Sequence, residues 1–179
     1  MKTFSFGKTK MELAVFFLEN PTKEFYESEV KKETEISTGA VNNYLKELAS
    51  ENVLILRKRG KMNFYRLNKD DDFVKQLKIT HNMSLPVVEE IKDIGKKLNL
   101  KIYLYGSVAR GEDTEDSDWD LLVIGSEKSH AIEREMDKLR KRFRKSIKLS
   151  IFTRLTWIKI KDKDPSFYER VEKDKIELI

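Results

Sequence analysis

Four residues near the middle of the chain have the types and the spacing of a phosphate and metal site. Gly106 and Ser107 follow an apolar run, and after ten further residues Asp118 and Asp120 lead into a second apolar run. These runs are typical of strands, and side chains two residues apart on a strand share one face, so both carboxylates are expected to point the same way. Paired carboxylates repel each other unless a cation lies between them, and oxygen-only ligation suits Mg²⁺ or Mn²⁺.

The glycine and the serine supply the phosphate-binding half of this predicted site. A glycine at the end of a strand can adopt unusual dihedral angles, and Ser107 is predicted to cap a short helix whose free amides face a phosphate. The alternative is an ordinary turn followed by a solvated acidic loop. That alternative accounts for the acids of residues 112–116 but not for Asp118 and Asp120.

The pattern resembles the minimal nucleotidyltransferases of the polymerase-beta-like nucleotidyltransferase superfamily, whose signature is Gly-Ser, ten residues and Asp-x-Asp. The likeness extends to residues 109–112 and to Ser117, and it covers residues 85–179. It implies transfer of a nucleoside monophosphate from a nucleoside triphosphate. ATP is the expected donor, and Mg²⁺ (or Mn²⁺) is the expected cofactor.

This resemblance also implies a role for each site residue. Gly106, Ser107 and Arg110 are expected to bind the phosphates of the nucleotide. Asp118 and Asp120 are expected to be catalytic and to ligate the metal ions that activate an acceptor hydroxyl and stabilise the leaving pyrophosphate.

Members of this family usually carry a third carboxylate on a later strand, and here the chain departs from the pattern. The candidate strand is 146–152, in which Ile147, Leu149 and Ile151 alternate as the buried face. The other face carries no acid and consists of Ser146, Lys148 and Ser150, with Ser150 expected at the place of the acid. Two hypotheses follow: an active transferase, or a nucleotide-sensing domain that has lost its chemistry.

The composition of the chain excludes several other classes of protein. The 179 residues include no cysteine, which excludes a disulfide framework and a thiolate zinc site. No apolar run approaches the roughly 18 residues of a membrane helix, so we expect a cytoplasmic protein with no membrane partner. The net charge of +5 is unevenly spread: residues 112–120 hold six acids and no base, whereas residues 138–163 hold eleven bases and one acid. The basic stretch predicts either a solvated helix face or a surface that faces a polyanion.

The first third of the chain has the pattern of three short helices. The first helix ends near residues 20–21. Its apolar residues are Met11, Val15, Phe16 and Leu18. Residues 27–34 suit a second helix. Ser37 is predicted to cap a third, in which Val41, Leu45 and Leu48 point inward and the open side carries Thr38, Asn42, Asn43 and Lys46.

A basic hairpin follows these helices. Residues 53–67 form two strand-like runs around Gly60, and the turn region carries Arg57, Lys58, Arg59 and Lys61. Helices and hairpin together resemble the winged helix-turn-helix domain of many prokaryotic transcriptional regulators, across residues 8–68. The resemblance implies double-stranded DNA as a partner, with the third helix in the major groove and the hairpin on phosphates. A winged helix that binds protein, with merely solvated lysines, is the alternative.

These patterns predict an α+β protein. Residues 1–68 form a winged helix-turn-helix DNA-binding domain, residues 69–84 a helical connector, and residues 85–179 a minimal nucleotidyltransferase domain with a small mixed sheet and flanking helices. Winged helices often act as dimers on two-fold sites, which favours a homodimer.

The pairing of the two domains predicts a DNA-associated nucleotidyltransferase with an unknown acceptor. Relatives modify protein hydroxyls, antibiotics or nucleic acid ends, and some minimal members are antitoxins that modify a separately encoded HEPN toxin. A protein acceptor such as a HEPN toxin is therefore one candidate partner. The alternatives are a winged-helix transcriptional regulator with a catalytically weakened nucleotide-binding domain, and an enzyme that modifies RNA ends.

Overall fold

The computed structural model describes residues 6–125 and 129–179. Contacts divide the chain into two compact units, Met1–Lys78 and Ile79–Ile179. One continuous helix, α4 (Asp72–Ser84), contains the division between the units. Its first part belongs to the first unit, where Val74 is buried and the ammonium of Lys78 donates to the carbonyl of Leu18.

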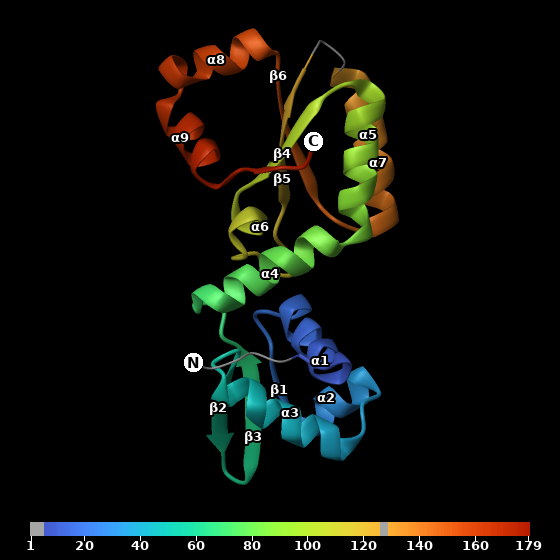
Figure 1. Cartoon of the computed structure of the whole chain (residues 1–179), viewed down its shortest axis with the longest axis vertical. Helices are drawn as coiled ribbons and strands as arrows, with labels where there is room; N and C mark the ends of the chain where they lie inside the picture. The colour runs from blue at the N-terminus through green and yellow to red at the C-terminus, as the bar shows by residue number, and fades with distance from the viewer. Residues whose placement is uncertain (1–5, 126–128) are drawn as a thin grey trace. The chain divides into compact units, whose positions relative to one another are not determined.

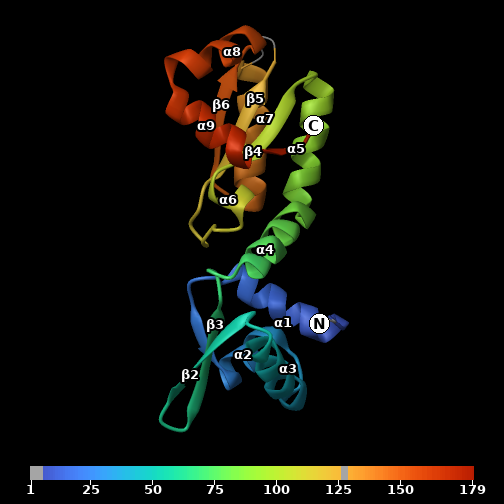
Figure 2. The same ribbon diagram turned by 60° about the vertical axis from the view of Figure 1, so that its left-hand side comes forward.

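The first unit has the architecture of a winged helix. In chain order its elements are α1 (Lys8–Glu19), β1 (Glu24–Tyr26), α2 (Glu27–Thr34), α3 (Thr38–Ser50), β2 (Leu54–Arg59) and β3 (Met62–Leu67). The three strands form an antiparallel sheet in the order β1-β3-β2. Figure 2 shows the β2–β3 hairpin, the wing, extending away from the helices.

The third helix of this unit matches its predicted pattern. Val41, Leu45 and Leu48 are fully buried in the core of the unit. Ser37 takes the N-cap position as predicted, but its side chain makes no capping hydrogen bond. Strand β1 was not predicted, because three residues are too few to show an alternating pattern, and it exists through its pairing with β3.

The predicted inner face of the first helix is partly wrong. Met11 is 39% exposed, whereas the buried residues of α1 are Lys10, Leu13, Ala14, Phe17 and Leu18. The orientation follows from Lys10, whose ammonium forms ion pairs with Glu47 of α3 at 3.3 Å and with Glu51, the residue after α3, at 2.8 Å. A buried charge needs such partners, so the helix face that includes Lys10 is turned toward α3.

The second unit is built on a mixed four-stranded sheet in the order β6-β5-β4-β7. Its strands are β4 (Lys101–Tyr105), β5 (Trp119–Ile124), β6 (Ile147–Phe152) and β7 (Ile176–Glu177), and only the β5–β6 pairing among them is parallel. The helices besides α4 are α5 (Pro86–Leu98), α6 (Ser107–Arg110), α7 (Ser129–Phe143), α8 (Arg154–Lys163) and α9 (Pro165–Asp174). In Figure 1, α5 and α7 lie on one side of the sheet, and α8 and α9 on the other.

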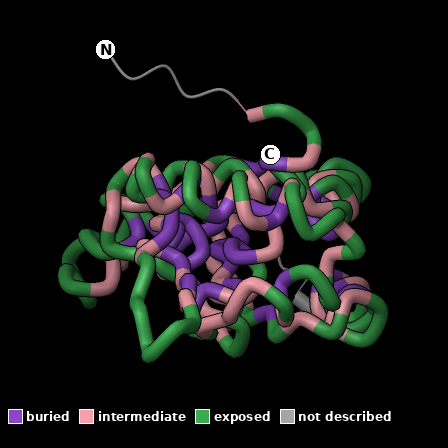
Figure 3. Tube along the Cα trace, turned by 90° about the horizontal axis from the view of Figure 1, so that it is seen from below, coloured by how far each residue is buried: buried purple, intermediate pink, exposed green. Residues whose placement is uncertain are grey.

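Alternation along β5 divides its side chains between these two layers. Trp119, Leu121 and Val123 pack in the core beneath α5 and α7. Leu122 packs on the opposite face, with Trp157 of α8 and residues of α9. Figure 3 colours each described residue by its burial, and exposed residues predominate along the outer turns of the trace. Since side chains on a strand alternate with period two, Asp120 shares the face of Leu122.

The helices of the second unit differ in how well the sequence predicts them. A proline followed by an apolar stripe predicts a helix over residues 86–98. Helix α5 has these bounds and buries Val87, Val88 and Ile91. Helix α8 was not predicted, because it lacks a clean apolar stripe. Trp157 is buried, while Leu155 and Ile158 are 73% and 63% exposed. No helix among residues 6–125 and 129–179 is long and apolar enough to cross a membrane.

The orientation of α1 gives a direct test. Changing the fully buried Leu13 to alanine is expected to lower the free energy of unfolding of the first unit by about 3 kcal/mol, because buried methyl groups are lost and a cavity remains. Met11→Ala on the same helix should cost less than about 0.5 kcal/mol. Hydrogen exchange of the α1 and α3 amides, read by mass spectrometry, measures both changes. Equal loss of protection in the two variants would contradict the observed helix face.

Candidate functional site

The turn at the end of β4 requires glycine at position 106. Gly106 has φ 80° and ψ −156°, a region that essentially glycine alone occupies. A Cβ atom placed there would lie 2.6 Å from Oδ2 of Asp120. The strand end and the carboxylate therefore approach each other more closely than any side chain at position 106 would allow.

The short helix α6 starts one residue earlier than its predicted cap implies. Gly106 is the N-cap, and Ser107, predicted to be the cap, is the first helical residue. No side-chain capping bond is formed. The carbonyl of Ser107 accepts a hydrogen bond from the amide of Glu112, which closes the loop after α6.

The two predicted site aspartates lie at the start of β5. Asp120 is paired with Tyr105 of β4 on one side and with Lys148 of β6 on the other. Asp118 directly precedes the strand, and both of its oxygens are engaged. Oδ1 accepts a hydrogen bond from Ser146 at 2.5 Å, and Oδ2 lies 2.5 Å from the ammonium of Lys148.

The two carboxylates have opposite electrostatic environments. The hydrogen bonds from Lys148 and then Ser146 hold the pKa of Asp118 below its usual value. Burial, followed by the charge of Asp118, raises the pKa of Asp120. The pair is therefore asymmetric, with one exposed, strongly paired carboxylate and one carboxylate that is partly removed from water.

Lys148, rather than Ser150, lies beside Asp120. The parallel register places Lys148 opposite Asp120 and Ser150 opposite Leu122, one step further along the strand. Ser150 also forms a 2.9 Å hydrogen bond with the hydroxyl of Tyr105. The sequence pattern identified the correct face of this strand but could not identify the residue nearest the aspartates, because that depends on the register between strands.

Arg110, predicted to bind phosphate, is tied to two acids. Its Nε donates to Glu112 at 2.7 Å, and one Nη donates to Asp174 of α9 at 3.0 Å. These contacts, led by the one to Glu112, raise the pKa of Arg110. The charge of Arg110 also acts to lower the pKa of Asp120, so the guanidinium is electrostatically coupled to the site.

The loop between the two halves of the site is more ordered than its sequence suggests. Asp113 is buried, and its Oδ1 accepts a hydrogen bond from the side chain of the buried Asn82 at 2.9 Å. Ser117 accepts from the amide of Thr114 at 2.8 Å. Sequence reasoning treated Asp113 as a solvated loop acid, and only the approach of α4 reveals its partner.

The donor set fits one divalent cation. Among residues 6–125 and 129–179 there is no cluster of three or more acids, histidines or cysteines suited to a metal ion. Asp120 on β5 and Asp118 directly before it supply carboxylate oxygens, and Mg²⁺ is commonly held by one or two carboxylates, substrate phosphates and water. A second ion would need a further ligand, whereas the residue opposite Asp120 on β6 is Lys148.

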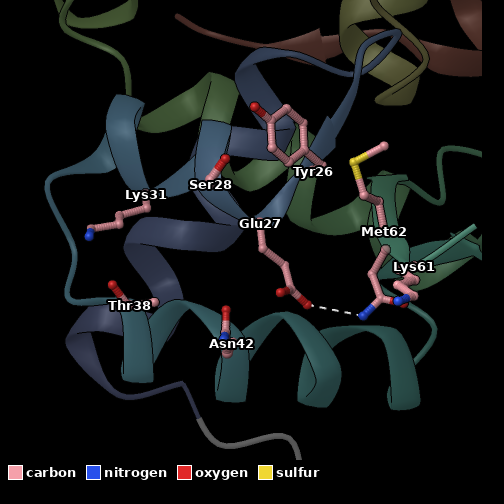
Figure 4. Close-up of a pocket in the computed structure, with 9 residues that line it drawn as sticks. Tyr26, Glu27, Ser28, Lys31, Thr38, Asn42, Lys61 and Met62 are labelled. Carbon is pink, nitrogen blue, oxygen red and sulfur yellow. Dashed lines mark hydrogen bonds between the residues drawn. The ribbon is translucent and has the colours of Figure 1, made fainter. Parts of the chain in front are cut away.

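The predicted DNA-reading helix presents most of its candidate residues to solvent. Thr38, Asn43 and Lys46 are exposed, and Asn42 is half-buried. Thr38 and Asn42 line a groove of about 320 Å³ together with residues of α2 and the wing. Figure 4 shows Glu27 pointing into this groove, where its carboxylate accepts a hydrogen bond from Asn63 at 3.1 Å. The negative charge of Glu27 repels phosphate groups from this groove. Contacts to DNA phosphates are therefore expected from the basic residues of the hairpin.

The hairpin residues fall into two groups. Arg57, Lys58 and Lys61 are exposed. Arg59 is also exposed, but it forms an ion pair with Glu24 and lies over the ring of Phe64, 4.8 Å from its centroid. All four predicted phosphate-contacting bases are therefore exposed, and one of them has partners on its own sheet.

One comparison with known proteins covers most of the second unit. The family described as "Nucleotidyltransferase domain" matches residues 87–178, just over half of the chain. The chain belongs to this family of nucleotidyltransferase domains. The matched stretch contains both the glycine turn and the aspartate pair.

Other comparisons are more distant. No curated protein matches the chain at a significant level. A solved structure of TrmBL2, described as an archaeal chromatin protein with a novel mode of DNA binding, matches with a TM-score of 0.33 and 14% identity, covering 96% of this chain and 72% of that one. With so low a TM-score and identity, this match gives no information about the function of the chain.

The contact between Gly106 and Asp120 predicts a strong effect of a single methyl group. Gly106→Ala is expected to weaken nucleotide binding by about 10- to 100-fold, because the strained backbone and the displaced carboxylate together cost about 1–3 kcal/mol. Calorimetry with Mg²⁺ and a non-hydrolysable ATP analogue measures this. Gly39→Ala is the matched control, since a Cβ atom at Gly39 meets nothing within 4 Å. Unchanged affinity in Gly106→Ala would show that nucleotide binds elsewhere.

Proposed function

We propose that this protein transfers a nucleoside monophosphate from a nucleoside triphosphate to an acceptor hydroxyl while it is associated with DNA. Membership of the nucleotidyltransferase family supports transfer from a nucleotide. The observation that carries the proposal is the approach of Gly106 to Asp120, which brings a side-chain-free turn against a carboxylate. This arrangement suits a phosphate held between backbone and metal.

The residues of the site take defined roles in this proposal. The turn at Gly106 and Ser107 receives the phosphates, with Arg110 supplying positive charge. Asp118 and Asp120 orient a divalent cation, Mg²⁺ or Mn²⁺, which would polarise the phosphate and stabilise the charge of the leaving pyrophosphate. The acceptor oxygen attacks the α-phosphorus, the bond to the pyrophosphate oxygen breaks, and the acceptor proton is lost to solvent.

The donor and the acceptor are proposed on the same ground. ATP is the proposed donor. A protein hydroxyl is the proposed acceptor, and a HEPN toxin is one such partner. Both come from the family resemblance of the Gly-Ser and Asp-x-Asp pattern.

Transfer of the nucleotide can be measured with two labels. The chain is incubated with Mg²⁺, cell extract and ATP labelled at either the α- or the γ-phosphate. We expect the chain to transfer label from the α-phosphate alone to an acceptor, because the γ-phosphate is part of the pyrophosphate that leaves. The Asp118→Asn, Asp120→Asn variant should lower the rate by at least about 100-fold, since the charges that hold the cation are removed.

The matched control changes two other acids of the same acidic segment. Glu115→Gln with Asp116→Asn alters the charge equally at exposed positions and should leave labelling intact. Protease and nuclease treatment of the labelled product separates a protein acceptor from RNA. Equal labelling by the chain and by the Asp118, Asp120 variant would overturn the proposal, and a complete absence of labelling would favour a regulator that only binds nucleotide.

The DNA association is proposed from the first unit. Its support is the winged-helix arrangement, the exposed bases of the wing and the polar open side of α3, where Asn42 and Asn43 are suited to reading adenine edges. A homodimer on a two-fold site is part of this proposal.

Salt dependence of DNA binding tests the wing. Replacing Arg57, Lys58 and Lys61 by glutamine is expected to lower affinity about 100-fold near 0.1 M salt and to reduce the salt slope by about three, because three phosphate contacts are lost. Fluorescence anisotropy with duplex genomic fragments measures both quantities. The control makes the same change to glutamine at three lysines of α5 in the second unit: Lys92, Lys96 and Lys97. An unchanged slope in the wing variant would favour a protein-binding role for the first unit.

A further inference from the structure

A lysine occupies the position next to the aspartate pair that a metal-binding acid would be expected to hold. Lys148 is opposite Asp120 in the β5–β6 register. Its ammonium is 2.5 Å from Oδ2 of Asp118, and its side chain is 65% exposed. The cation is thus in direct contact with one site carboxylate and adjacent to the other.

The polar residues on either side of Lys148 are uncharged and already hydrogen-bonded. Ser146, directly before β6, donates a hydrogen bond from its hydroxyl to Asp118, and Ser150 is hydrogen-bonded to Tyr105. Lys148 is therefore the residue of this strand face that brings charge to the site. Its flexible four-carbon stem and its exposure allow the ammonium to move between Asp118 and a bound phosphate without entering an apolar region.

The sign of this charge limits what else the site can hold. An ammonium has no lone pair to offer a metal ion, and it repels a second divalent cation at contact distance. It can, however, donate up to three hydrogen bonds to phosphate oxygens, which is the role that lysine has in many phosphate sites. One divalent cation and one lysine together supply three positive charges, which attract the negative charge of a triphosphate and of the two aspartates.

We propose that Lys148 takes the place of a second metal ion in the nucleotide site. Before nucleotide binds, its ammonium neutralises Asp118. When a nucleoside triphosphate binds with a single Mg²⁺ or Mn²⁺ on the aspartates, the ammonium moves to a phosphate oxygen. This inference rests on the proposed function, because it concerns the same nucleotide site.

Counting bound metal ions tests the inference without measuring turnover. The full chain is titrated with Mn²⁺ in the presence of a non-hydrolysable ATP analogue, and free Mn²⁺ is followed by electron paramagnetic resonance. Ions that remain bound to the Asp118→Asn, Asp120→Asn variant are subtracted, since they belong to other acids. We expect one ion for the native chain and two for Lys148→Asp, in which a third carboxylate becomes available.

Two methionine variants separate the role of the ammonium from that of fold. Lys148→Met should still bind one ion but lose about tenfold in affinity for the analogue, because one charged phosphate contact is removed. Lys141→Met makes the same change on α7, which covers the opposite face of the sheet, and should behave as the native chain does. Circular dichroism confirms that each variant is folded.

The results distinguish failure of this inference from failure of the proposed function. Two ions in the native chain, a single ion in folded Lys148→Asp, or full analogue affinity in Lys148→Met would each overturn the role of Lys148 while leaving nucleotide transfer in place. If the native chain binds no more Mn²⁺ than the Asp118, Asp120 variant does, both proposals are overturned.

Discussion

The close approach of the β4 turn to the carboxylate of Asp120 is the constraint on which the second unit depends. Because a Cβ atom at Gly106 would lie 2.6 Å from Oδ2 of Asp120, the turn and the acid can lie together only if position 106 has no side chain. The sheet then determines the rest of the site. Asp120 faces the side of α8 and α9, and its neighbours in β4 and β6 are Tyr105 and Lys148.

Several charged groups of this site have partners within the protein. Asp118 is paired with Lys148, and Arg110 is paired with Glu112 and Asp174. Such internal pairing lets charged groups remain close together. A nucleotidyltransferase domain with a lysine in this position differs from a site built of acids alone, since part of its positive charge is covalently attached to the chain.

The first unit presents a mixed surface rather than a uniformly basic one. Arg57, Lys58 and Lys61 project from the wing, whereas Glu27 lies in the groove beside Thr38 and Asn42. Burial and the charge of Glu27 raise the pKa of Tyr65, whose hydroxyl contacts that carboxylate, to about 12. An acid held in this way beside the wing strand β3 repels anions from the groove.

Local features of the sequence predicted most elements and the residues of the candidate site. Period-two alternation predicted that the carboxylates of Asp118 and Asp120 share a face, and proline followed by an apolar stripe predicted the helix of residues 86–98, because these signals depend only on neighbours in the chain. Tertiary structure alone decided the contacts between segments that are distant in the sequence. The pairing of β5 with β6 placed Lys148 beside the aspartates, α4 brought Asn82 to Asp113, and the partners of Lys10 turned α1. Each depends on segments distant in sequence, whose register and partners are set only when the chain packs.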